Sequence, residues 1–282
     1  MGVALFYRNS KGIILTEYGL LFYSYALKQQ QDYEKMRKDI HNINHPQIKS
    51  ISIGTSCVTS KNLPSLIYKF KKAEPGVHFS IDVATPQQQL TKLEKQIFDF
   101  IMVSAVLDGL DEKQHVVHEI GYHDFIFIAA KSGMWKDVDE ISLLHLPKYP
   151  LVVRERGATG RMVLEKLVKK YGVNLETCNV VCEMNSIDVI IAAVISGMGI
   201  AVVPRLLVED ILAVNNLKVL YINELCDQII RVPFQLIHLK NKEPQNVTKK
   251  FINYIHHSSC LVDKKTLILV NSLLSLCGCG CL

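Results

Sequence analysis

The sequence lacks any apolar run long enough to cross a membrane. The longest such run, Ile187–Val203, contains Asp188 and is interrupted by Gly197 and Gly199. A membrane helix needs about 20 predominantly apolar residues, so a buried helix, a glycine turn and a buried strand explain this run better. The first residues also lack the charged region and long apolar core of a secretory leader. We therefore expect a cytoplasmic protein with no membrane partner.

Catalytic and cofactor-binding motifs are missing too. No GxSxG, HExxH, P-loop or GxGxxG pattern occurs anywhere in the chain. His115, His118, Glu119 and His123 are close in sequence, but on a strand and turn their odd spacings point them to opposite faces. The sequence therefore predicts no enzyme activity, no cofactor and no metal site.

Charge and cysteine give little guidance to function. The formal net charge is only +5, and no long block of Lys or Arg stands out, so a nucleic-acid partner has weak support from charge alone. Five of the eight cysteines, Cys57 among them, are scattered among apolar neighbours, as is typical of core residues in a reducing compartment. Cys277, Cys279 and Cys281 alternate with glycine, which favours an unstructured, thiol-bearing tail over a metal site of fixed geometry.

A long amphipathic helix is the first element that the sequence does predict. Between Thr16, a suitable N-cap, and Pro46, apolar positions recur at spacings of three and four residues. One narrow apolar stripe on so long a helix needs a partner, and a second copy is the simplest one. We expect a homodimer or homotetramer, held through Phe22, Ala26, Tyr33, Met36, Ile40 and Ile43.

Beyond Pro46 strands alternate with helices. Strands are expected at Ser50–Ile53, Val77–Val83 and Phe98–Val103, two more β runs within Val116–Ala130, and later strands at Leu151–Arg154, Val180–Met184, Ile200–Val203 and Ile230–Leu239. Helical patterns separate most of them, among them Leu63–Lys72 and Thr159–Tyr171. This alternation predicts an α/β fold with largely parallel sheets, and its length favours two lobes with a ligand crevice at the strand ends.

Several motifs resemble those of LysR-type transcriptional regulators. Gly2, Leu5, Phe6, Arg8, Ile14, Leu15, Thr16 and Gly19 match the pattern of the family's DNA-binding wing, and the long helix follows it. Ile51–Ser56, Phe98–Ile101, Arg154–Arg161 and Glu183–Pro204 are similar to blocks of the family's effector domain, although Ala158 replaces the family's serine.

The resemblance implies a domain plan. Residues 1–16 would be the remnant of a winged helix-turn-helix, 17–46 a dimerisation linker helix, and 47–260 a two-lobed effector domain that resembles periplasmic binding proteins. Lobe I would hold about 47–126 and 229–260, lobe II about 127–228, and residues 261–282 would form an atypical tail.

The same resemblance implies transcription regulation with a damaged DNA reader. The family's first two helices and nearly all of its recognition helix, the one that enters the major groove, are absent from the sequence, so only Arg8 and Lys11 of the wing are left to contact phosphate. We expect weak, sequence-indifferent DNA binding, unless Met1 is not the true start. The alternative function is a solute-receptor type of binding protein without a DNA role.

Four segments at predicted strand-to-helix turns are expected to form the effector site. They contain Thr55, Ser56, Cys57, Thr85, Gly157, Ala158, Thr159, Asn185 and Ser186. Free N–H groups at helix N-termini and nearby hydroxyls favour anions, so a small anionic metabolite is the expected effector. Taken singly, each hydroxyl could equally be a helix cap.

Overall fold

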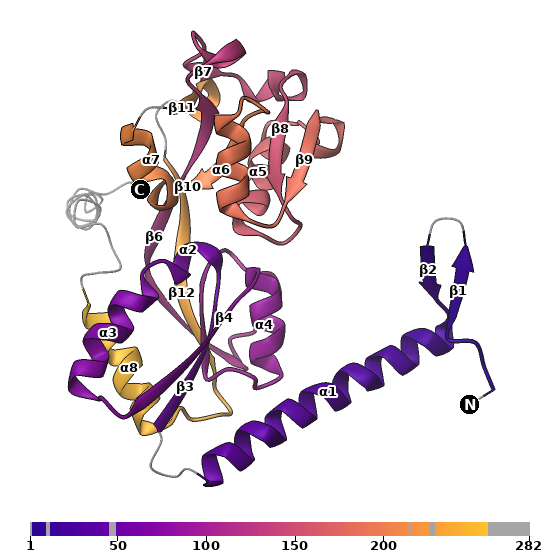
Figure 1. Cartoon of the computed structure of the whole chain (residues 1–282), viewed down its shortest axis with the longest axis vertical. Coiled ribbons are helices and arrows are strands. Elements are labelled where there is room, and N and C mark those ends of the chain that lie inside the picture. The colour runs from indigo at the N-terminus through magenta and orange to yellow at the C-terminus, as the bar shows by residue number, and fades with distance from the viewer. Residues whose placement is uncertain (1, 10–11, 45–48, 215, 226–228, 259–282) are drawn as a thin grey trace, which may run out of the picture.

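The computed structural model describes all residues except 1, 10–11, 45–48, 215, 226–228 and 259–282. Figure 1 shows a body of two lobes, a long helix that extends away from one of them, and a β-hairpin at the far end of that helix. The predicted cysteine-rich tail, Lys11 and Pro46 lie outside the described residues.

The hairpin pairs β1 (Phe6–Asn9) with β2 (Gly12–Leu15) and leads directly into α1 (Glu17–Asn44). The Thr16 hydroxyl accepts a hydrogen bond from the Gly19 N–H at 2.9 Å, which confirms Thr16 as the N-terminal cap. A Cβ on Gly19 would lie 1.7 Å from the Leu5 carbonyl oxygen. Only glycine therefore allows the hairpin to pack against the first turn of the helix.

The predicted stripe on α1 is exposed in this single chain. The exposed fractions of Phe22, Tyr33, Met36 and Ile40 run from 44% to 56%, and Ala26 is half-buried. The side chain of Ile43 is outside the described set. Arg8 lies exposed on β1. Pairing through the stripe and phosphate binding by the hairpin stay predictions.

Lobe I is built on three parallel strands, β3 (Lys49–Thr55), β4 (Val77–Val83) and β5 (Phe100–Ser104). Its helices are α2 (Cys57–Ser60), α3 (Leu63–Ala73), α4 (Pro86–Glu94) and α8 (Asn246–His257). The apolar faces of α3 and α8 close one core cluster against β3 and β5, with Phe70, Phe100 and Phe251 at its centre. The short helix α2 was not predicted.

Two long strands connect the lobes. β6 (His115–Ala130) and β12 (Ile230–Leu239) pair antiparallel over ten registered positions, with an irregularity between Phe234 and Gln235. One end of β12 pairs with β5 in lobe I, and the other end of β6 pairs with strands of lobe II. The sequence predicted two separate β runs in this part of the chain, which is wrong: β6 is one continuous strand.

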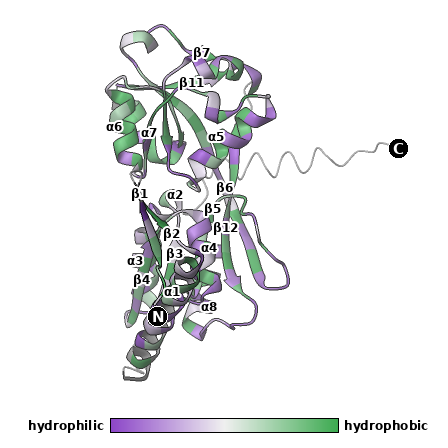
Figure 2. Ribbon diagram, turned by 90° about the vertical axis from the view of Figure 1, so that its right-hand side faces the viewer, coloured by the Kyte–Doolittle hydropathy of each residue, from purple (hydrophilic) through white to green (hydrophobic). Residues whose placement is uncertain are grey.

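Lobe II contains β7 (Glu140–Ile141), β8 (Leu151–Arg154), β9 (Val180–Met184), β10 (Ala201–Pro204), β11 (Leu217–Ile222), α5 (Thr159–Lys170), α6 (Ile187–Ile195) and α7 (Arg205–Val214). Short 3-10 turns lie at Gly133–Trp135, Leu143–Lys148, Leu175–Thr177 and Asn223–Leu225. Figure 2 shows α6 and the central strands as hydrophobic ribbons, in agreement with their burial.

The main sheet is mixed and not largely parallel, which corrects the sequence-based expectation, whereas the separate pair of β8 and β9 is parallel as expected. The main sheet runs in the order β4-β3-β5-β12-β6-β11-β7, with β10 also paired to β6. The pairs of β12 with β5 and of β6 with β10, β11 and β12 are all antiparallel. The crossing strands cause this, because the chain enters lobe II along β6 and returns along β12 in the opposite direction.

Candidate functional site

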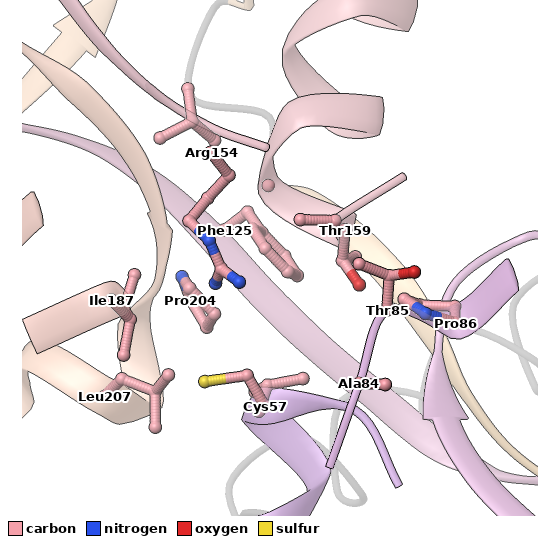
Figure 3. Close-up of a pocket in the computed structure, with 14 residues that line it drawn as sticks. Cys57, Ala84, Thr85, Pro86, Phe125, Arg154, Thr159, Ile187, Pro204 and Leu207 are labelled. Atoms are coloured by element: carbon pink, nitrogen blue, oxygen red, sulfur yellow. The ribbon is translucent and has the colours of Figure 1, made fainter. Parts of the chain in front are cut away.

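A small cavity lies between the lobes (Figure 3). Its volume is about 30 Å³, and its lining comes from both lobes: Cys57, Val58, Ala84, Thr85, Pro86, Phe125, Arg154, Ala158, Thr159, Gly160, Ile187, Val202, Pro204 and Leu207. One water needs about 10–15 Å³ measured in this way. The lobes are therefore closed on each other, with room for only a few waters.

Arg154 supplies a positive charge beside this cavity. It ends β8, and its guanidinium donates to the Glu155 carboxylate at 2.7 and 2.8 Å and to the Asn185 carbonyl at 3.2 Å. Only 12% of its side chain is exposed. Figure 3 shows the guanidinium pointing down between Ile187 and Phe125 toward Cys57. A two-point pair of this kind fixes the position of the arginine, and guanidinium also suits carboxylate and phosphate ligands.

Cys57 faces Arg154 from lobe I. Burial raises the pKa of the Cys57 thiol, and the nearby Arg154, whose charge and hydrogen bond lower it, does not reverse the direction. Asp188 and Glu155 raise the same pKa further. The thiol is therefore neutral near pH 7, so it does not neutralise the positive charge of Arg154.

The N-terminus of α5 also faces the cavity. Ala158 occupies the N-cap position and has no side chain that could cap the helix. The hydroxyl of Thr159, the next residue, donates to the Ser104 carbonyl of lobe I at 2.7 Å and so does not cap the helix. The first N–H groups of α5 thus lack a side-chain cap and lie beside a cationic side chain, an arrangement that favours anions.

Thr85 and Gly157 meet across the lobe boundary. Thr85 caps α4 through Gln88, with Oγ1 accepting from the Gln88 N–H at 3.4 Å. Gly157 has a φ of +84°, and a Cβ placed on it would lie 3.5 Å from the Thr85 hydroxyl oxygen. Glycine is favoured here because its backbone is left-handed.

Four predicted site residues are not among those that line this cavity. Thr55 is fully buried, and its hydroxyl is 2.5 Å from the Thr59 hydroxyl. The Ser56 hydroxyl accepts from the Ser104 N–H at 3.3 Å. Asn185 is exposed, and the Ser186 hydroxyl caps α6 by accepting from the Val189 N–H at 3.5 Å.

The structure thus brings together Cys57, Thr85, Ala158 and Thr159 of the predicted set, with Gly157 next to Thr85. Sequence reasoning left out Arg154 as a site residue. Arg154 is the first residue of the Arg154–Arg161 segment that resembles a family motif, but the resemblance alone gives this side chain no role.

A family model described as the LysR substrate binding domain matches residues 45–259. The chain belongs to the LysR-type regulator family. The HTH-type transcriptional regulator SoxR of Arthrobacter sp. is 25% identical over 258 residues, covering 90% of this chain and 82% of that protein. The activator CmpR of Synechocystis sp. is 23% identical over 260 residues, covering 90% and 81%.

Solved structures agree on the fold. The regulatory domain of Synechocystis CcmR in complex with 2-PG has a TM-score of 0.65 at 21% identity, covering 74% of this chain and 96% of that one. The effector-binding domain of QuiR in complex with shikimate has a TM-score of 0.61 at 19% identity, covering 73% and 94%. The predicted two-lobed effector fold behind a long helix is confirmed.

Membership of this family makes the chain a transcription regulator with an effector domain and not an enzyme. Across the described residues no helix is long and apolar enough to span a membrane. Within the same residues no group of three or more His, Cys, Asp or Glu side chains is arranged to hold a metal ion.

Proposed function

We propose that this LysR-type regulator senses a small anionic metabolite in the cleft between its lobes. The observation that carries the proposal is the placement of the Arg154 guanidinium next to the uncapped first turn of α5. Two similar effector domains were solved with 2-PG and with shikimate, the second of which is a carboxylate. Cys57, Thr85 and Thr159 would border the bound anion.

Binding of a metabolite requires the lobes to separate. A cavity of about 30 Å³ is far smaller than the roughly 300–1,000 Å³ typical of ligand pockets. Among the described residues, the polar contacts to be broken include the hydrogen bond from Thr159 to Ser104, that from the Lys61 amine to the Leu206 carbonyl at 2.7 Å, and the contact of Arg154 with the Cys57 thiol. An effector would thus act by changing how far apart the lobes stand.

We also propose that α1 pairs with a second copy in the cytoplasm and that the hairpin contacts DNA phosphate through Arg8 and Lys11. Phosphate contacts carry no base specificity. Residues 1–282 by themselves should therefore bind DNA weakly and with strong dependence on salt.

The test of the effector site is a thermal-shift and calorimetric screen with small carboxylates and phosphates. Arg154→Gln should weaken binding of the ligand found by roughly ten- to a hundredfold, because hydrogen bonds to charged groups contribute about 1.5–3 kcal/mol. Arg156→Gln is the matched control, since Arg156 is an exposed neighbour that does not border the cavity. Equal affinity of the two variants and the wild type would contradict the assignment.

A further inference from the structure

A second cavity lies beside α5 and β12. We call it the α5–β12 cavity; its volume is about 270 Å³, and it is lined by Ala105, Val106, Thr159, Met162, Val163, Lys166, Leu167, Lys170, Ile230, Arg231, Val232 and Pro233. Thr159 borders this cavity as well as the effector cleft. Its volume is close to the lower end of the range for small-molecule pockets.

The walls of the α5–β12 cavity are apolar and come from three places. Lobe I contributes the segment after β5, where the Val106 side chain is 54% exposed although it is large and apolar. Lobe II contributes the α5 face that carries Met162, Val163 and Leu167, all half-buried. β12, one of the two crossing strands, contributes Val232 and Pro233. A flat apolar ligand would remove this apolar surface from water.

The polar groups among the lining residues are, apart from the Thr159 hydroxyl, cationic. Arg231 forms a 3.5 Å ion pair with Asp124, and the Lys170 amine lies 5.5 Å from the centre of the Tyr171 ring. Lys166 forms no ion pair with any of the described residues and is exposed on α5. An apolar ligand with one negative group would therefore find a complementary charge at Lys166.

We propose that the α5–β12 cavity is a second binding site, for a small aromatic carboxylate. The ring packs against Val106, Met162 and Leu167, and the carboxylate lies toward Lys166. Because the walls belong to both lobes, the ligand holds the lobes in one arrangement. The proposal rests on the lining of this cavity and not on the identity of the effector.

The test uses 2-naphthoate, titrated calorimetrically into the full chain. Val106→Trp fills the cavity from an exposed position and should abolish measurable binding, whereas Val189→Trp, at an exposed valine of α6, should leave it unchanged. Lys166→Glu should weaken binding about fivefold or more, as removal of an exposed charge pair costs up to about 1 kcal/mol and reversal adds repulsion. Lys169→Glu makes the same charge change on the same helix outside the cavity and should have little effect.

Three results would overturn the proposal. The first is failure of the wild-type chain to bind 2-naphthoate. The second is binding that is lost in Arg154→Gln and retained in Val106→Trp, which would place the ligand in the effector cleft. The third is a change of oligomeric state in Val106→Trp with 2-naphthoate affinity unchanged, which would make this surface a contact between copies. The neutral analogue 2-naphthalenemethanol should bind to the wild type more weakly than 2-naphthoate does. Its affinity should be the same for the wild type and for Lys166→Glu.

Discussion

Thr159→Val removes the hydroxyl that joins lobe II to lobe I. In the closed arrangement Thr159 Oγ1 donates to the Ser104 carbonyl at 2.7 Å, and only 9% of Thr159 is exposed. Valine keeps the volume and the branched Cβ, so the substitution leaves no cavity. What changes is one buried hydrogen bond between two elements, α5 and β5, that are distant in sequence.

The size of the effect follows from burial. A hydrogen bond between neutral groups contributes about 1 kcal/mol net, and a buried acceptor left without its donor costs about 1–3 kcal/mol. We expect the free energy of unfolding to fall by about 1–2 kcal/mol, since the Ser104 carbonyl regains water only if the lobes separate. The exposed bond from Lys61 to the Leu206 carbonyl should matter less: Lys61→Met should cost at most about 0.5 kcal/mol.

Urea unfolding followed by tryptophan fluorescence measures this difference. The chain has one tryptophan, Trp135, and it is buried in lobe II. The matched control is Thr177→Val, because the Thr177 hydroxyl donates to the Asn174 carbonyl at 2.8 Å but lies at the surface. If Thr159→Val and Thr177→Val unfold at the same urea concentration, the hydrogen bond across the lobes contributes nothing and the reasoning fails.

Three further changes have expected outcomes. Gly160→Ala should lower the free energy of unfolding by about 1–3 kcal/mol, because a Cβ there would lie 2.9 Å from a carbonyl of β10, whereas Gly76→Ala, in open space, should not. Burial lowers the pKa of His123 to about 4. Below pH 6.5 the unfolded chain therefore binds a proton at His123 that the folded chain does not bind. The free energy of unfolding is unaffected by His123 above pH 6.5 and should fall by about 3 kcal/mol as the pH drops to 4, at about 1.4 kcal/mol per pH unit. In urea unfolding, His123→Leu should make the free energy of unfolding depend less on pH over this range. Met36→Asp with Ile40→Asp should turn dimers into monomers in sedimentation, and a wild-type monomer at micromolar concentration would contradict pairing through α1.

Much of the fold was predictable because its elements are long or strongly patterned. β4, β8, β9 and β12 have the bounds that the sequence predicted, and α3 and α5 differ by one residue at their C-terminal ends. β11 (Leu217–Ile222) was missed, and α2 has only four residues, too few for a helical period to be recognised.

β6 shows where a local pattern stops being informative. After the buried His115, its first half alternates between half-buried and exposed positions, and its last six residues are all buried. The change reflects different neighbours: lobe I covers one part of the strand, and β10 and β11 flank the other part in lobe II. In the sequence this change of environment looks like the end of one strand and the start of another, although the hydrogen-bonded ladder continues along β12.

The effector site was predictable in its elements and not in its side chains. Strand ends and helix starts follow from pattern, so the turns at Cys57, Thr85 and Thr159 could be assigned to one crevice. The direction of a hydroxyl depends on partners distant in the chain. Thr59 lies next to the Thr55 hydroxyl, and it donates its own hydroxyl to the Met102 carbonyl of the neighbouring strand at 2.7 Å, and no local rule connects these three residues.

The crossing strands explain how the lobes could separate without unfolding. β6 and β12 are the long strands shared by both lobes, and their pairing is irregular between Phe234 and Gln235. His123 stacks on the Phe234 ring at this level, with centroids 5.0 Å apart, and neither ring nitrogen has a hydrogen-bond partner among the described residues. Bending at this irregular position breaks no hydrogen bond of the His123 ring, so it should cost less than bending a regular, fully bonded ladder.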